Sequence, residues 1–199
     1  MTVILNTGCG NLNSVRFALE RLGQTVEMTA DKATILSAER VIFPGVGSAE
    51  YAMEQLRQSG LDTLLPELSQ PVLGICLGMQ LLTDSSTETT ETVTKTLSLI
   101  PGQTEALSNE GVRLPHMGWN QLQTISDHPL FHGITQEDFF YFVHGYGVKP
   151  SEYTIATCEY GQAFSAAIAK QNMMGVQFHP ERSGLSGEKI LRNFLEISA

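Results

Sequence analysis

The residue best suited to covalent chemistry is Cys76, which stands at the centre of Gly74–Gly78 (Gly-Ile-Cys-Leu-Gly). An apolar stretch over 71–75 leads into this segment and a helix-like stretch follows it, the pattern of a nucleophile elbow with sulfur replacing serine oxygen. Such a sharp turn exposes its central side chain in a cleft, and free N–H groups at the start of the helix favour the thiolate. The pentapeptide alone also fits a small buried cysteine packed between glycines.

A histidine and a carboxylate able to serve such a thiol stand together in 176–181 (Val-Gln-Phe-His-Pro-Glu). Proline restricts the residue before it to extended conformations, so we expect His179 at the end of a strand with Glu181 pointing to the same side. The carboxylate would then orient the imidazole, and the other ring nitrogen would reach the thiol. A histidine near a turn is more often structural, but with the elbow cysteine these residues predict a Cys76–His179–Glu181 triad.

A glycine-rich segment, Pro44–Gly47 (Pro-Gly-Val-Gly), follows another apolar run. Because glycine tolerates positive φ, a peptide unit here could point its N–H into the same cleft. With the N–H of Leu77, it would then stabilise an oxyanion. The simpler interpretation, a turn before a helix, stays open for this segment.

Other segments lack the spacing needed for phosphate or metal binding. Gly8–Gly10 follows an apolar run, but a dinucleotide fingerprint would need a third glycine at Asn13, and no P-loop spacing is present. His128 and His132 are four positions apart, yet Pro129 argues against a shared helix face. We therefore expect neither a metal ion nor another cofactor.

The first half of the chain alternates strand-like and helix-like segments, which predicts βαβ units and a parallel sheet covered on both faces. The expected strands are 3–5, 25–28, 41–43 and 71–75. The expected helices are 12–22, 48–58 with Ser48 as its cap, and one that begins at 77–82.

The second half is strand-rich, with candidates at 97–100, 119–123, 139–143, 154–158, 164–169 and 173–178. A last amphipathic helix over 186–197 would bury Ile190, Leu191, Phe194 and Leu195. Between the halves, Thr83–Thr96 is rich in Ser, Thr and Glu, so we interpret it as a solvated loop without chemistry. No repeat or linker divides the chain, which predicts a single domain over 1–199.

Composition excludes several function classes. The 199 residues are 42% hydrophobic, ample for one core, and 12 Lys and Arg against 21 Asp and Glu give a net charge of -9. So acidic a chain repels nucleic acids and anionic membrane surfaces. Because the basic residues are scattered, a phosphorylated substrate would have to bind chiefly on another protein.

The cellular setting is predicted from the cysteines and from the apolar runs. No apolar run approaches the ~20 residues of a membrane helix, and no signal peptide is visible. Cys9, Cys76 and Cys158 are odd in number and far apart, which favours reduced thiols. We expect a cytoplasmic protein.

The assembled motifs resemble those of the triad (class I) glutamine amidotransferases, in Gly74–Gln80 (Gly-Ile-Cys-Leu-Gly-Met-Gln) and in His179-Pro-Glu181. Three further segments, 8–15, 114–120 (Leu-Pro-His-Met-Gly-Trp-Asn) and 176–184, resemble the branch of this family that serves histidine biosynthesis, as does Pro44–Gly47. The resemblance runs from the first strand to the last helix. It implies a flavodoxin-like α/β fold with a mostly parallel central sheet flanked by helices.

The resemblance also implies an activity, hydrolysis of L-glutamine to L-glutamate and ammonia through a thioester on Cys76. His179 would be the general base and acid, oriented by Glu181. The oxyanion hole would come from the backbone of Leu77, Gly45 and Val46, and the glutamine site from Gly47, Gln80, Gly145 and Tyr146.

A partner is implied as well, a (βα)₈-barrel cyclase subunit in a heterodimer. Ammonia would pass through a tunnel to this subunit, which would make imidazole glycerol phosphate and an aminoimidazole carboxamide ribotide. The candidates for the partner-facing surface are Asn11, Ser14, Trp119, Tyr141 and Arg182.

Two departures from the family pattern stand out. Gly145 occupies a position that is usually Ser or Thr, so a hydroxyl is lost while backbone contacts remain, and Thr83–Thr96 lacks the usual glycine before the next strand.

Three alternatives stay open. They are a glutaminase subunit of another pathway, a non-catalytic interaction module that kept the fold, and a stand-alone cysteine hydrolase.

Overall fold

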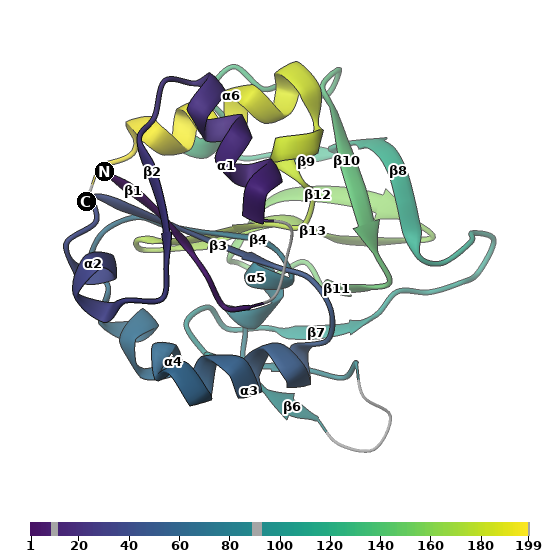
Figure 1. Cartoon of the computed structure of the whole chain (residues 1–199). Coiled ribbons are helices and arrows are strands. Elements are labelled where there is room, and N and C mark those ends of the chain that lie inside the picture. Colours follow the sequence, from purple (N-terminus) through teal and green to yellow (C-terminus); the bar gives the residue numbers. More distant parts are fainter. Residues whose placement is uncertain (9–11, 89–92, 199) are drawn as a thin grey trace.

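The computed structural model describes residues 1–8, 12–88 and 93–198, so the candidate Asn11 and the thiol of Cys9 lie outside the described residues (Figure 1). The largest sheet has the strand order β2-β1-β3-β4-β14-β13-β12-β9. These strands are β1 (Thr2–Leu5), β2 (Val26–Thr29), β3 (Arg40–Gly45), β4 (Val72–Cys76), β9 (Thr124–Ile125), β12 (Thr154–Tyr160), β13 (Gln162–Lys170) and β14 (Met173–Val176).

The first part of this sheet is parallel. Strands β2, β1, β3, β4 and β14 pair in parallel, in the order that flavodoxin-like sheets share. Strands β13, β12 and β9 extend it with antiparallel pairs. Short connections join β12 to β13 and β13 to β14 as hairpins, whereas a long segment separates β9 from β12. The predicted α/β class and parallel core are confirmed, and part of the strand-rich second half forms the antiparallel extension.

Helices cover both faces of the sheet, with α1 (Leu12–Arg21) and α6 (Gly184–Glu196) above it and α3 (Ala49–Ser59) and α4 (Leu61–Leu64) below it in Figure 1. Two short helices, α2 (Lys32–Leu36) and α5 (Leu77–Leu81), complete the set, with 3₁₀ turns at Leu65–Glu67, Pro129–Phe131 and Pro180–Arg182. Ser48 caps α3 as expected, because its hydroxyl accepts from the Tyr51 N–H at 3.4 Å. Within the described ranges, no helix has the length and apolarity needed to cross a membrane.

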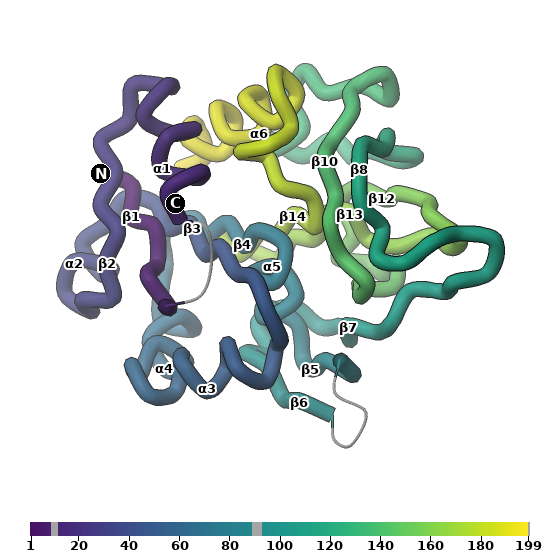
Figure 2. The backbone as a smooth tube through the Cα atoms, turned by 45° about the vertical axis from the view of Figure 1, so that its right-hand side comes forward, coloured from purple at the N-terminus to yellow at the C-terminus, as the bar shows by residue number. Residues whose placement is uncertain are grey.

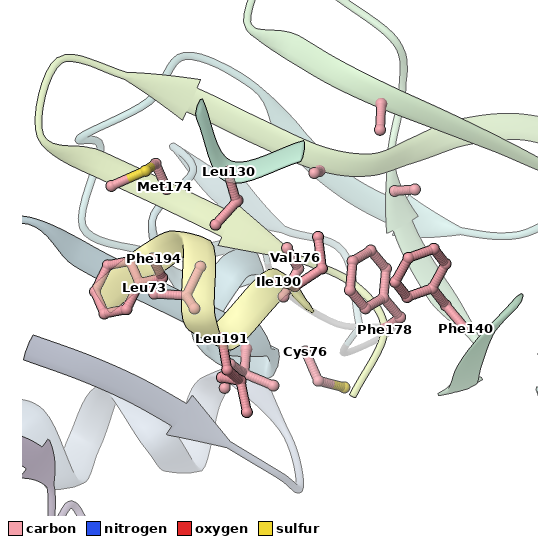
Figure 3. Close-up of a cluster of buried hydrophobic side chains, with 14 of the residues drawn as sticks. Leu73, Cys76, Leu130, Phe140, Met174, Val176, Phe178, Ile190, Leu191 and Phe194 are labelled. Carbon is pink, nitrogen blue, oxygen red and sulfur yellow. The ribbon is translucent and has the colours of Figure 1, made fainter. Parts of the chain in front are cut away.

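Each face of the sheet has its own apolar core. Figure 3 shows Ile190, Leu191 and Phe194 of α6 packed among sheet residues, with Cys76 at the edge of this cluster. Leu195, expected to be buried with them, is only partly buried. The opposite face is filled by α3 and α4, through Ala49, Ala52, Met53, Leu56, Leu61 and Leu64.

Two smaller sheets stand beside the main one. The first, the β8–β10 ribbon, pairs β8 (His116–Gln121) with β10 (Phe139–His144) in antiparallel register. Figures 1 and 2 both show it on the opposite side of the molecule from α2 and β2. The second has the order β11-β7-β5-β6, from β11 (Tyr146–Val148), β7 (Gln103–Ala106), β5 (Ser85–Ser86) and β6 (Thr94–Lys95).

The prediction of a strand at 97–100 is wrong. The N–H groups of this segment bind the carbonyls at the C-terminal end of α5, with Leu97 on Leu81 at 3.0 Å and both Leu99 and Ile100 on Leu82 at 2.9 Å. A helix leaves its last carbonyls without internal partners, and here the N–H groups of an irregular segment satisfy them. The apolar residues that suggested a strand are therefore used to cap a helix.

The interpretation of Thr83–Thr96 as a solvated loop is also wrong for its described part. Thr83 and Ser86 are fully buried, and the segment supplies β5 and β6. Hydroxyl groups replace apolar side chains here: Thr83 Oγ1 donates to the Gln80 carbonyl at 2.7 Å. Sequence polarity does not predict exposure when each buried hydroxyl finds a partner.

The strand-to-helix turn at Cys76 depends on backbone groups that touch. A Cβ on Gly78 would fall on the carbonyl oxygen of Phe43 in β3, and a Cβ on Gly74 would lie 2.7 Å from the Gly78 carbonyl carbon. Real Cβ atoms do not approach backbone this closely, so both glycines are sterically required.

We predict that Gly78→Ala lowers the free energy of unfolding by about 3 kcal/mol or more, because β3 and α5 must separate to admit the methyl group. Denaturant unfolding followed by circular dichroism measures this. Gly145→Ala is the matched control, since a Cβ there has nothing within 4 Å, and it should change stability by about 0.5 kcal/mol or less. Equal stability of the two variants would contradict the steric argument.

Candidate active site

Cys76 is the last residue of β4, and α5 begins at the next residue. Its backbone has φ 54° and ψ −112°, a conformation that non-glycine residues rarely adopt and that is concentrated at functional sites. The residue is 8% exposed and lines a cavity of about 390 Å³. The thiol therefore lies at the boundary between the apolar core and the cavity, and Figure 3 shows Cys76 at the edge of the apolar cluster.

His179 and Glu181 form a buried pair, with 2.8 Å between Nδ1 and Oε1 and side-chain exposures of 9% and 5%. His179 is extended, as the following proline requires, and its N–H donates to the Tyr141 carbonyl at 2.9 Å. The expectation that the chain stays extended to Glu181 is wrong, because Pro180–Arg182 is a 3₁₀ turn. The pair is made by this turn rather than by strand alternation.

The charge state of His179 follows from its neighbours. Burial alone would lower the pKa of the imidazole, but contacts with Cys76 and Glu181 outweigh it and raise the pKa above its ordinary value. Nε2 is buried and forms no hydrogen bond with the described residues, and the nearby Cys76 sulfur contributes to the raised pKa of the ring. Glu181 thus holds one nitrogen, and the other is left for the reacting groups.

The cavity brings together the residues that the motifs suggested. Its lining includes Gly45, Val46, Gly47, Cys76, Leu77, Gln80, Gly145, Tyr146, His179, Glu181 and Arg182. The size suits a small ligand. Across the described part of the chain, no group of three or more His, Cys, Asp and Glu side chains could hold a metal ion.

The glycine-rich segment and the elbow meet at one end of the cavity. Gly45 pairs in register with Cys76, and a Cβ on Gly45 would lie 3.1 Å from both the Gly78 nitrogen and the Leu77 Cβ. Gly47 has φ +94°, which favours glycine. Backbone groups from both segments therefore border the thiol, the arrangement that an oxyanion hole needs.

Two cavity-region residues were missed by reasoning from the sequence. Glu88 lines the cavity, and its carboxylate accepts from the Ala49 N–H at 2.6 Å, while Tyr146 donates to its carbonyl at 3.3 Å. Nothing in a Ser/Thr-rich segment marks one glutamate for such a place.

The second is Gln177, which is fully buried. Its Nε2 donates to the Cys76 sulfur at 3.7 Å, and its Oε1 accepts from Gln80 Nε2 at 2.9 Å. The available signal was an amide in the middle of an apolar strand, where only a specific hydrogen-bond role justifies burial.

Three of the candidates for a partner surface form one cluster. The rings of Trp119 and Tyr141 meet edge to face at 6.0 Å, and the Arg182 guanidinium lies 4.5 Å from the Tyr141 ring centre. Trp119 is 55% exposed, which is unusual for so large an apolar side chain. Ser14 belongs to α1, one residue before Val15 of the cavity wall.

The family model described as glutamine amidotransferase class-I matches residues 3–197, and the chain belongs to that family. A solved glutamine amidotransferase structure superposes with a TM-score of 0.75 at 19% identity, covering 98% of this chain and 97% of that chain, which supports the fold.

Closer relatives are imidazole glycerol phosphate synthase subunits HisH. The protein from Colwellia psychrerythraea is 54% identical, covering 99% of this chain and 93% of the relative. The protein from Mannheimia succiniciproducens is 52% identical, with 98% of each chain covered. These relatives are named as subunits, which implies a partner subunit.

We predict that His179 titrates above its ordinary pKa of 6.5 and that Glu181→Gln lowers this pKa, because the carboxylate that stabilises the imidazolium is lost. The positive charge should persist through neutral pH and disappear as the pH rises through the raised pKa. NMR titration of the imidazole measures both. A pKa at or below 6.5 in the unaltered chain would contradict the electrostatic account.

Proposed function

We propose that this chain is the glutaminase subunit of imidazole glycerol phosphate synthase, acting as one domain over 1–199 in histidine biosynthesis. The observation that carries the proposal is the cavity in which the elbow thiol, the His179–Glu181 pair and two glycine-bordered backbone segments meet. The identity of 54% to a HisH subunit supports the choice of pathway.

The proposed first half-reaction forms a thioester. The Cys76 sulfur attacks the carboxamide carbon of glutamine as a thiolate, because its proton is already held by the His179 imidazolium. The carbonyl oxygen becomes an oxyanion that the N–H groups of Leu77 and of the Gly45–Val46 segment stabilise. His179 then donates its Nε2 proton to the departing nitrogen, the C–N bond breaks, and ammonia leaves.

The second half-reaction consumes water. His179 takes a proton from the water, the resulting hydroxide attacks the thioester carbon, and the C–S bond breaks. The proton taken from water stays on His179, and glutamate is released with the thiolate–imidazolium pair restored. Glu181 keeps the proton on Nδ1 and stabilises the imidazolium in both halves, which the raised pKa of His179 supports.

The polar groups of the same cavity would bind glutamine. Both N–H groups of the Gln80 amide are used, on Tyr146 O at 3.0 Å and on Gln177 Oε1 at 2.9 Å, so its Oε1 is the atom left to accept from a ligand. Glu88 supplies a carboxylate for the α-ammonium group. Gly47 and the backbone of Gly145 and Tyr146 border the remainder of the substrate.

The proposed partner is the (βα)₈-barrel cyclase subunit, which would receive ammonia directly and bind the phosphorylated substrate. The exposed apolar side chains Met117, Trp119 and Phe139 on the β8–β10 ribbon suit a protein interface. Tyr141 and Arg182 connect this ribbon to the cavity, and Ser14 and Asn11 remain proposed contacts. The free thiols Cys76 and Cys158 suit the reducing cytoplasm in which we place the enzyme.

We predict that Cys76→Ser abolishes glutamine-driven synthesis in the reconstituted pair but retains ammonium-driven synthesis, because only ammonia supply depends on the sulfur. Product formation from each nitrogen source is measured on the same complex. Equal loss of both activities would contradict a role confined to ammonia supply.

We predict that Glu88→Gln raises the KM for glutamine about 10-fold or more with little change in kcat, because it removes a charged contact and keeps an acceptor for the Ala49 N–H. Steady-state glutaminase assays of the complex measure this. Glu50→Gln, on the exposed side of α3, is the control and should leave KM unchanged. An unchanged KM in Glu88→Gln would remove the carboxylate from the glutamine site.

A further inference from the structure

Two buried histidines, His116 and His144, have no part in the proposed chemistry, yet they are joined in one series of hydrogen bonds. His116 is 2% exposed and His144 is 6% exposed. His116 Nδ1 lies 3.1 Å from His144 Nε2, and His144 Nδ1 lies 2.7 Å from the Tyr146 carbonyl. On the other side, Asn120 Nδ2 lies 3.4 Å from His116 Nε2.

The partners determine where each proton sits. A carbonyl only accepts, so His144 carries its proton on Nδ1, and neutral His144 then accepts at Nε2. His116 must donate to it from Nδ1 and accept from Asn120 at Nε2. The Asn120 orientation is fixed independently, because its Nδ2 donates to Glu159 O at 3.0 Å and its Oδ1 accepts from the Gln121 N–H at 2.8 Å. Both imidazoles are therefore Nδ1–H tautomers, and each hydrogen bond of the series is donated in the direction of the Tyr146 carbonyl.

Both rings are held neutral and immobile by their surroundings. His116 stacks between Tyr160 at 4.0 Å and Phe142 at 4.8 Å, and Phe164 meets His144 edge to face at 4.9 Å. Burial lowers the pKa of His116 to about 4 and that of His144 to about 3. At neutral pH, both rings therefore stay neutral and keep the Nδ1–H tautomers that their hydrogen bonds set.

The series ends at the proposed substrate site. The Tyr146 carbonyl accepts from His144 and also from Gln80 Nε2 at 3.0 Å, so two donors fix this one oxygen. Gln80 in turn donates to Gln177, whose amide lies on the Cys76 sulfur. The Gln80 amide is thereby held with its Oε1 available to a ligand.

The other end of the series lies in the β8–β10 ribbon. His116 and Asn120 occupy one face of β8, and the alternate residues Met117 and Trp119 are 63% and 55% exposed on the other. The ribbon register places His116 directly opposite His144. One strand therefore carries both the inner hydrogen bonds and the outer apolar surface.

We propose that His116 and His144 are positioning residues, a fixed-tautomer relay that orients Gln80 through the Tyr146 carbonyl and joins the β8–β10 ribbon to the glutamine site. The expected effect of this relay on KM rests on the proposed function. The hydrogen bonds and tautomers that form the relay are properties of the free chain and do not depend on it.

The first test is spectroscopic. Long-range ¹H–¹⁵N NMR of the free chain distinguishes the two imidazole tautomers. We expect Nδ1–H for both His116 and His144 between pH 6 and 8, whereas the exposed His132 should show the mixture typical of free imidazole. An Nε2–H tautomer or a charged ring at either relay position would overturn the proposal, whether or not the chain is a glutaminase.

The second test is kinetic and uses the reconstituted complex. His144→Phe keeps an aromatic ring but removes both polar atoms, and we expect the KM for glutamine to rise about 10-fold. His144→Asn restores a donor to the Tyr146 carbonyl and should recover most of this loss. His116→Phe should raise KM in the same direction. Ammonium-driven synthesis should stay unchanged in all three variants, which shows that the partner subunit is intact.

Phe164→Leu is the control for packing, because it disturbs the same aromatic cluster without removing a relay bond. We expect a lower melting temperature with an unchanged KM. If Phe164→Leu raised KM as much as His144→Phe, or if His144→Asn recovered none of the loss, the histidines would have only a structural role and the proposal would be wrong. Absence of glutaminase activity in the unaltered complex would instead refute the proposed function and leave the NMR result standing.

Discussion

The contact between the start of α5 and the end of β3 is the constraint on which the site depends. Gly78 packs directly against the Phe43 carbonyl, and Gly74 packs against the Gly78 backbone. Because no side chain separates these segments, the chain can turn sharply at Cys76, whose backbone has positive φ, and hold the sulfur at the cavity. The same closeness brings Gly45 beside Leu77, so the backbone donors from two strands' ends border one thiol.

Polar groups enter this apolar region only as members of connected hydrogen bonds. Gln177 and Gln80 are buried, and each amide is bound to the next group along, from the Cys76 sulfur to the Tyr146 carbonyl. A buried amide without a partner costs free energy, so such a set is stable only when its bonds are satisfied together. The geometry around the thiol is thus determined by several residues at once rather than by His179 alone.

The β8–β10 ribbon relates the cavity to the outer surface. It displays Trp119 and Met117 to solvent, and its second strand supplies Tyr141, whose carbonyl binds the His179 N–H. A protein that docked on this ribbon would contact a strand bonded directly to a residue of the proposed triad. This placement is consistent with a glutaminase whose activity is exercised in a complex, as the subunit names of its relatives imply.

The amino-acid sequence by itself determined the local features: the elbow at Cys76, the His-Pro-Glu segment, the alternation that builds the parallel sheet, and the Ser48 cap. These depend on glycine sterics, proline restriction and hydrophobic period, which act over a few neighbouring residues. Only the tertiary structure placed Glu88 and Gln177 at the site, turned 97–100 into a helix cap, and joined His116 to His144. The physical reason is that each of these is a hydrogen bond between distant segments, and the polarity of a residue does not say which distant partner will satisfy it.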